Sequence, residues 1–183
     1  IRPTGTGQVH VGGFKIESLG APTASTDAAT KQYVDDVAQG LAVQAPAICG
    51  STDTLAVMSG GTVVYDNGTA GVGATLTISG DTLTVIDGVT LTVGDRIVIK
   101  DEASLPNNGI YTYTSTTVLT RATDFDTPTE MAGGDFIFIQ QGTTLNDTGF
   151  VMTDPVVTVG TSDVTFVQFS GAGSFTAGAG LTL

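Results

Sequence analysis

The sequence is poor in basic residues and in cysteine, and both shortages exclude classes of protein. Only 6 Lys and Arg stand against 18 Asp and Glu in 183 residues, which gives a formal net charge of -12. Phosphate neutralisation needs clustered Lys and Arg, so this composition excludes nucleic-acid binding. The single cysteine, Cys49, excludes an internal disulfide and a thiolate metal cluster within one chain. We expect Cys49 to be a small buried hydrophobic residue.

Histidine is almost absent as well, and this argues against nucleophilic catalysis. A Ser-His-Asp set would have to use His10, and no G-x-S-x-G elbow occurs in the chain. No carboxylate or cysteine lies at ligand spacing beside His10, so we interpret it as a polar side chain on a strand. A pH-sensitive group or a metal ligand on a threefold axis is the alternative.

Long apolar runs are missing too. None approaches the length that spans a bilayer, and no signal-peptide arrangement of basic, apolar and small residues is present. We therefore expect a soluble protein without membrane insertion. The first residue is Ile1 and the last four are Gly-Leu-Thr-Leu, from which we expect a section of a longer protein.

What the sequence does contain is threonine, valine and 25 glycines, a composition typical of β-structure. From Gly61 onward, strand patterns recur every eight to twelve residues, the spacing of an all-β sandwich or barrel. We predict a mainly β fold: an N-terminal β arm and one short helix, followed by an antiparallel β-sandwich or barrel-like domain. The expected boundaries are 1–46 for the arm, helix and linker (42–46), 47–170 for the β-rich domain and 171–183 for a Gly-rich extended tail leading to a further section.

Within the β-rich domain the alternation of apolar and polar residues predicts individual strands. Three related Thr-rich pieces, 73–78, 80–85 and 88–93, are expected to form a meander, with a short β-solenoid as the rival interpretation. Asn108-Gly109 is the strongest two-residue hairpin signal. The other predicted strands are 62–65, 97–100, 110–113, 118–121, 136–139, 150–152, 156–159 and 164–169.

The stretch 13–41 predicts a short strand, a turn and one amphipathic helix that Gly40 ends. One face of this helix carries apolar residues at spacings of four, three and four, as in a coiled coil. A helix of about fourteen residues is marginal in water by itself, so we expect it to pack against identical helices, as a dimer or a trimer. The expected oligomerisation residues are Thr30, Val34, Val37 and Leu41, supported by Ile16 and Leu19.

The same stretch resembles the repeated joint of bacteriophage tail fibres. It matches a G-x-K-I-x-x-L strand (Gly13 to Leu19), Pro22, the run D-A-A-T-K-x-Y-V-D (Asp27 to Asp35) and Gly40-Leu41. Further segments that resemble tail-fibre proteins are 65–76, 86–89, 94–96, 108–111, 119–126 and 178–183. The resemblance implies a structural, non-enzymatic section of a homotrimeric tail fibre in the virion, made in the host cytoplasm. Other tail or baseplate proteins and a host surface receptor are the implied partners.

Two groups of acidic residues keep other functions open. A glycosidase needs a pair of carboxylates, and Asp124, Asp126 and Glu130 cluster in one predicted loop, with Asp101-Glu102 in another. The D-x-D-x-x-x-E pattern could also hold calcium. Because the chain has no Trp and few aromatic residues near these acids, we interpret them as solvated loops, with no catalytic, metal or cofactor site. A receptor-binding tip that uses loops 101–108 and 122–131 is the main alternative to a shaft section; a glycan-cleaving depolymerase is the third.

Overall fold

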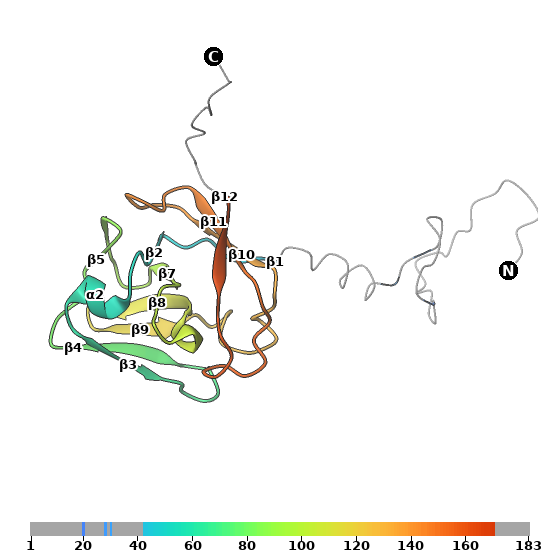
Figure 1. Ribbon diagram of the computed structural model, residues 1–183, viewed down its shortest axis with the longest axis horizontal. Coiled ribbons are helices and arrows are strands. Elements are labelled where there is room, and N and C mark those ends of the chain that lie inside the picture. The colour runs from blue at the N-terminus through green and yellow to red at the C-terminus, as the bar shows by residue number, and fades with distance from the viewer. Residues whose placement is uncertain (1–19, 21–27, 29, 31–41, 171–183) are drawn as a thin grey trace, which may run out of the picture. The chain divides into compact units, whose positions relative to one another are not determined.

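The computed structural model describes residues 20, 28, 30 and 42–170 (Figure 1). The chain divides into two compact units, Ile1–Gly40 and Leu41–Leu183, and residues 42–170 belong to the second. Within the described part, no helix has the length and apolar character to cross a membrane.

The second unit is mainly β, which confirms the predicted fold class. Its strands belong to a four-stranded sheet, a six-stranded sheet and one separate hairpin. In chain order the elements are β1 (Ala42–Val43), β2 (Cys49–Gly50), α2 (Leu55–Ser59), β3 (Thr62–Asp66), β4 (Thr75–Ser79), β5 (Val85–Ile86), β6 (Val89–Thr90), β7 (Arg96–Ile99), the 3-10 helix η1 (Leu105–Asn107), β8 (Gly109–Ser115), β9 (Val118–Arg121), β10 (Asp135–Ile139), β11 (Thr148–Met152) and β12 (Phe166–Ser170).

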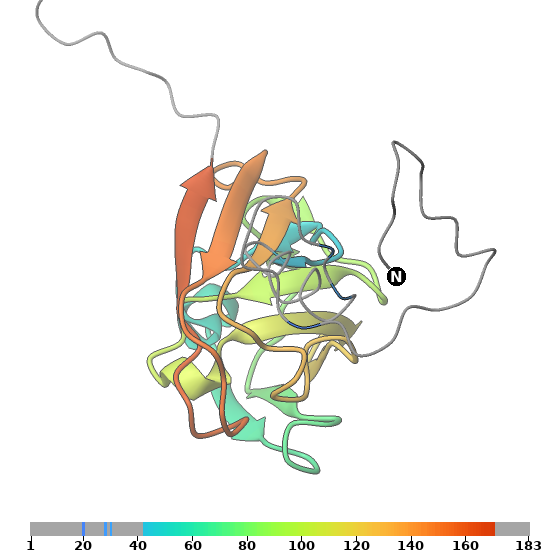
Figure 2. The same ribbon diagram turned by 90° about the vertical axis from the view of Figure 1, so that its right-hand side faces the viewer.

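The two larger sheets pack as a sandwich. The four-stranded sheet has the order β1-β10-β11-β12 and the six-stranded sheet the order β2-β7-β8-β9-β4-β3. Figure 2 shows β10, β11 and β12 side by side, in orange and red, beside the green and yellow strands of the larger sheet. A first core lies between them, with Val98 and Ile110 from one sheet and Ile137, Phe150 and Met152 from the other. Neither sheet closes into a barrel in the described part.

A second core covers the opposite face of the six-stranded sheet. Leu76, Ile97 and Leu119 of that sheet pack there with Leu55 of α2 and with apolar residues of the segment that holds the β5–β6 hairpin. Cys49 belongs to this core and is fully buried, as the sequence predicts. Burial and the neighbouring Asp95 and Asp87 raise the pKa of its thiol to about 12, so Cys49 is unreactive at neutral pH.

The predicted Thr-rich meander is wrong in its second and third pieces. Only the first piece is a strand of the six-stranded sheet, where β4 pairs with β3 and β9. The other two contribute the short β5–β6 hairpin, whose turn at Asp87-Gly88 is where the sequence places it. Leu83, Ile86 and Leu91 are buried, whereas Val85 and Val93 are 45% and 69% exposed. The buried residues are three and five apart, so strict alternation does not describe these pieces.

Asn108-Gly109 does not form a two-residue hairpin. Ile99 pairs with Gly109, so the connection from β7 to β8 runs through residues 100–108 and includes η1. The side chain of Asn108 is buried, accepts a hydrogen bond from the Glu102 amide and donates one to the carbonyl of Val164. Tertiary hydrogen bonds, rather than turn geometry, explain an asparagine at this position.

Three other segments differ from the prediction. Residues 156–159 lie outside any strand, with Val156 and Val159 buried singly in the first core. Residues 42–46, expected to be a linker, begin with β1, which pairs in parallel with β10. The helix α2 was not predicted.

Candidate functional site

The most distinctive surface of the described unit is the outer face of the four-stranded sheet. One row of side chains crosses all four strands, because Val43 pairs with Phe136, Phe136 with Val151 and Val151 with Val167. These residues alternate with the buried Ile137, Phe150 and Met152, so they point away from the first core. We call this row, together with Phe138 and Phe169, the outer apolar face.

The side chains of the outer apolar face are open to solvent in one chain. Val43, Val167 and Phe169 are 74%, 53% and 68% exposed, while Phe136, Phe138 and Val151 are half-buried. Phe136 and Phe169 meet edge to face, with ring centroids 6.1 Å apart. Contiguous exposed apolar faces are typical of interaction sites, whereas single exposed apolar residues are not, so the outer apolar face is the candidate site.

Charge is almost absent from the sheet that carries this face. The only ionisable side chain in its four strands is Asp135, which is 3% exposed and accepts hydrogen bonds from Gln44 and from the Ala132 amide. Burial raises the pKa of Asp135 above its ordinary value, against those two hydrogen bonds. In a chain of net charge -12, this face can therefore approach a second copy without placing acidic groups together.

The part of the six-stranded sheet that the four-stranded sheet leaves uncovered is mainly polar, in contrast to the outer apolar face. On the face of β4, β8 and β9 that points away from the second core, threonines predominate: Thr75, Thr77, Thr112, Thr114 and Thr120, together with Val118. Thr114 and Thr120 are hydrogen-bonded through their hydroxyl groups at 2.8 Å. This threonine-rich face is suited to water, whereas the outer apolar face is not.

The predicted oligomerisation residues are mostly outside the described residues. This applies to Ile16, Leu19, Val34, Val37 and Leu41, and also to His10. Thr30 is described and is half-buried. The outer apolar face as a whole was not predicted from the sequence. One of its strands was: the run Phe136 to Ile139 is apolar on both faces, which favours either central packing or a subunit contact.

The carboxylates of the acidic loop 122–131 are bound by other groups of the same chain. Asp124 forms an ion pair with Arg96 at 2.7 Å, and Glu130 accepts hydrogen bonds from the Thr127 hydroxyl at 2.7 Å and the Thr127 amide at 3.1 Å. The Thr127 hydroxyl group lowers the pKa of Glu130. Asp126 is 4% exposed, and burial, followed by the charge of Glu130, raises its pKa.

The second acidic pair is also structural. Glu102 is buried and accepts a hydrogen bond of 2.6 Å from the amide of Leu55, at the start of α2. Asp101 accepts hydrogen bonds from Ser51 and Lys100. Across the described residues, no three His, Cys, Asp or Glu side chains are placed to hold a metal ion. The calcium hypothesis for Asp124, Asp126 and Glu130 therefore finds no geometric support.

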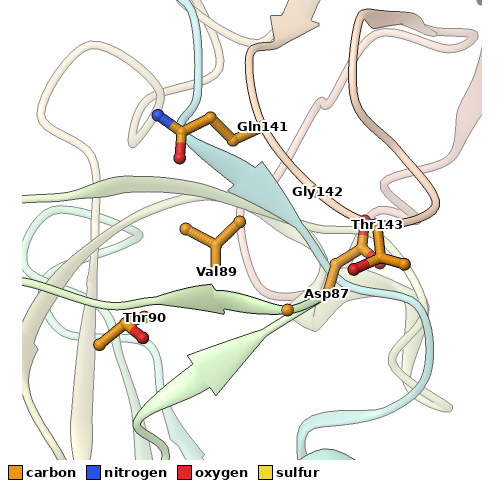
Figure 3. A pocket seen from close by; sticks show the side chains of 7 residues that line it. Asp87, Val89, Thr90, Gln141, Gly142 and Thr143 are labelled. Carbon is orange, nitrogen blue, oxygen red and sulfur yellow. The ribbon is translucent and has the colours of Figure 1, made fainter.

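A second surface feature is a polar groove of about 470 Å³ beside the β5–β6 hairpin (Figure 3). It is lined by Asp87, Gly88, Val89, Thr90, Gln141, Gly142 and Thr143. The Asp87 carboxylate accepts hydrogen bonds from the amides of Thr144 and Leu145, at 2.9 and 2.8 Å, and its carbonyl accepts one from the Thr143 amide. Asp87 thus ties the hairpin to the loop before β11, and the groove has no aromatic wall.

Comparison of the chain with protein-family models, with curated proteins and with solved structures finds no match.

Proposed function

We propose that the chain is a structural section of a homotrimeric bacteriophage tail fibre, part of the virion and used in host attachment. The observation that carries the proposal is the outer apolar face, a row of uncharged apolar side chains across four strands that one chain leaves open to solvent. A fibre section needs such a surface, because its chains must associate along their length while an acidic exterior keeps the fibre soluble.

The outer apolar face alone supports association of copies. The proposal of a tail fibre rests in addition on the resemblance of residues 13–41 to the joint of tail fibres. β1 begins at Ala42, directly after the predicted helix, so a helix that brings copies together also brings their four-stranded sheets together. The role is mechanical and adhesive: many weak contacts to a host surface become strong when one fibre presents them together. Asp124 pairs with Arg96 of β7, and Asp126 and Glu130 interact within their own loop, which favours a role without catalysis.

The oligomeric state tests this proposal. We expect the full chain to have the mass of a trimer in light scattering and native mass spectrometry. Val167→Asp places a charge on the outer apolar face. It should lower the association constant about tenfold or more, which shifts the measured mass toward that of the monomer. Val64→Asp is the matched control, because Val64 is 61% exposed on β3 of the other sheet. A monomeric unmodified chain, or equal effects of the two substitutions, would contradict the proposal.

A receptor-binding module is the second candidate, and the polar groove favours it. Thr90, Gln141 and Thr143 can exchange hydrogen bonds with hydroxyl groups of a neutral glycan. Host-cell binding by the purified chain that is lost on Gln141→Ala, with the trimer intact, would support this role. A shaft section should show no such binding.

A further inference from the structure

Within residues 42–170, the four-stranded sheet has two edges to which no further strand is paired, and they run in the same direction; just beyond β1, the carbonyl of Ala45 accepts a hydrogen bond from Arg96 Nε. β1 is parallel to β10, β10 is antiparallel to β11, and β11 is antiparallel to β12, so β1 and β12 are parallel to one another at opposite edges. The amides of Ala42 and Gln44 donate to β10, so the backbone amide of Val43 points to the open side of β1. Within the described residues, no strand pairs with the other side of β12.

Resting on the proposed function, we propose that three copies join edge to edge, β12 of one chain beside β1 of the next, and enclose their outer apolar faces around a threefold axis. The occupant of the outer apolar face is then the same face of two further copies. A contact between two different edges is head-to-tail, and such a contact closes into a ring when the rotation fits. Parallel pairing of β12 with the neighbouring β1 satisfies backbone groups that the isolated chain leaves open.

The width of the sheet favours three copies. With strands about 4.8 Å apart, four strands and one junction make a side of about 19 Å. In a triangle with such sides, the threefold axis lies about 5.5 Å from each sheet. This is close to half of the ~10 Å that separates packed sheets, so side chains fill the interior. A square would place the axis about 10 Å away and leave a void, which packed interiors avoid.

The composition of the outer apolar face fits an enclosed interior. Phe136, Phe138 and Phe169 supply bulk, the valines fill the remaining space, and no ionisable side chain points inward. Asp135, the acidic residue of this sheet, is buried and alternates with the outward Phe136. Asp124 and Glu130 lie in the loop 122–131, and Asp101 lies beside Ser51 and Lys100. Three acidic chains can therefore meet through this surface with little mutual repulsion.

Cysteine cross-linking of the full chain tests the ring. Val43 and Val167 lie three strand spacings apart in one sheet, about 14 Å, whereas a disulfide needs Cα atoms less than about 7 Å apart. A disulfide between Val43→Cys and Val167→Cys can thus form only between copies. We expect covalent dimers and trimers from V43C/V167C or from V43C/F169C. The second pair is included because β12 could pair with the neighbouring β1 in a register shifted by two residues. Cys49 is fully buried and does not compete.

The control is V43C/V64C, which places the second thiol on the other sheet and should give no covalent trimer. If light scattering shows a trimer but the cysteine pairs give no more covalent trimer than V43C/V64C, the ring is overturned and the proposed function stands. If light scattering shows a monomer, both are overturned. If the cysteine variants fail to assemble, hydrogen exchange of the unmodified trimer decides. The ring requires the Val43 and β12 amides to exchange about tenfold or more slowly than in the V167D monomer; equal rates would overturn it.

Discussion

At the residue scale, Arg121 is the most informative side chain, because it is a buried cation without a carboxylate. It is 1% exposed, and its guanidinium donates to the carbonyls of Asn108 and Pro106 and to the hydroxyl of Tyr65. The same group lies 5.0 Å from the ring centroid of Tyr111 and 5.8 Å from that of Tyr65. The residues described place no carboxylate within ion-pair distance of it. Arg121 thus holds the η1 loop and β3 against β9.

Replacing Arg121 by Met should destabilise the fold strongly. The apolar stem is kept, but the buried carbonyl of Asn108, the half-buried carbonyl of Pro106 and the hydroxyl of Tyr65 lose their donor, which costs about 3 kcal/mol in total. Urea unfolding followed by circular dichroism measures this loss. Asp124→Asn is the control: it removes the half-exposed partner of Arg96 and should cost under about 1 kcal/mol. Similar losses for both variants would contradict the role assigned to Arg121.

Two glycines in one turn offer a second comparison at this scale. Gly71 and Gly73 both have positive φ, at 110° and 71°. A Cβ at Gly71 would meet the carbonyl oxygen of Asp126 and lie 2.8 Å from Cβ of Val159, whereas a Cβ at Gly73 has nothing within 4 Å. The turn containing Gly71 therefore packs directly on the loop 122–131 and on Val159.

Gly71→Ala should cost about 3 kcal/mol or more, because backbone strain and a collision with a carbonyl act together. Gly73→Ala should cost only about 1 kcal/mol, from the strained φ alone. Thermal unfolding of both variants in parallel measures the difference. Equal melting temperatures would show that the backbone near Asp126 yields easily.

At the scale of elements, Asp87 connects two parts of the chain that are 57 residues apart. Its carboxylate is the acceptor for the amides of Thr144 and Leu145, so the β5–β6 hairpin fixes the loop that leads into β11. Gly88 and Gly142 allow this approach, because a Cβ at either position would meet Thr143 or Asp87. The loop thus depends on the hairpin for its position.

Asp87→Ala should release that loop without unfolding the sheets. The amides of Thr144 and Leu145 lose their acceptor, and we expect their hydrogen exchange to accelerate about tenfold or more, since each lost bond is worth about 1.5 kcal/mol. Amides of β7 and β8 should be unchanged and serve as the internal control. Uniform acceleration over all strands would instead indicate global destabilisation.

Alternation in the sequence predicted β4, whose two faces differ, whereas β10 was predicted from a run that is apolar on both faces. It failed where burial is irregular: Leu83, Ile86 and Leu91 are buried by a loop-like path, and α2 is too short to show a helical period. The full extent of the outer apolar face could not be predicted beyond the run Phe136 to Ile139, because it depends on β1 pairing with β10 across more than 90 residues. Side chains of one row come from four separate segments, and only the fold brings them together.

At the scale of the whole molecule, acidity should make stability depend on pH in an unusual direction. Burial raises the pKa values of Glu102 and Asp135 and, together with Glu130, that of Asp126. A raised pKa means that the folded chain binds protons more tightly than the unfolded chain, so stability is lost as pH rises through the folded pKa values. The net charge of -12 adds repulsion at neutral pH. Both effects favour the folded chain as the pH falls from 7 toward the ordinary pKa range of carboxyl groups.

Glu130 acts in the opposite direction. Its pKa in the folded chain is lowered from the ordinary 4.5, so its contribution to the free energy of unfolding is lost as the pH falls through that lowered pKa. We therefore expect the urea midpoint to increase as the pH falls from 7 toward the ordinary carboxyl range, and to decline only at lower pH, where Glu130 is protonated. The triple variant Glu102→Gln, Asp126→Asn, Asp135→Asn should flatten the increase at 0.5 M salt, where surface repulsion is screened. A midpoint that falls steadily from pH 7 downward, or a slope that the triple variant leaves unchanged in salt, would contradict the assignment of the pH response to these three buried carboxyls.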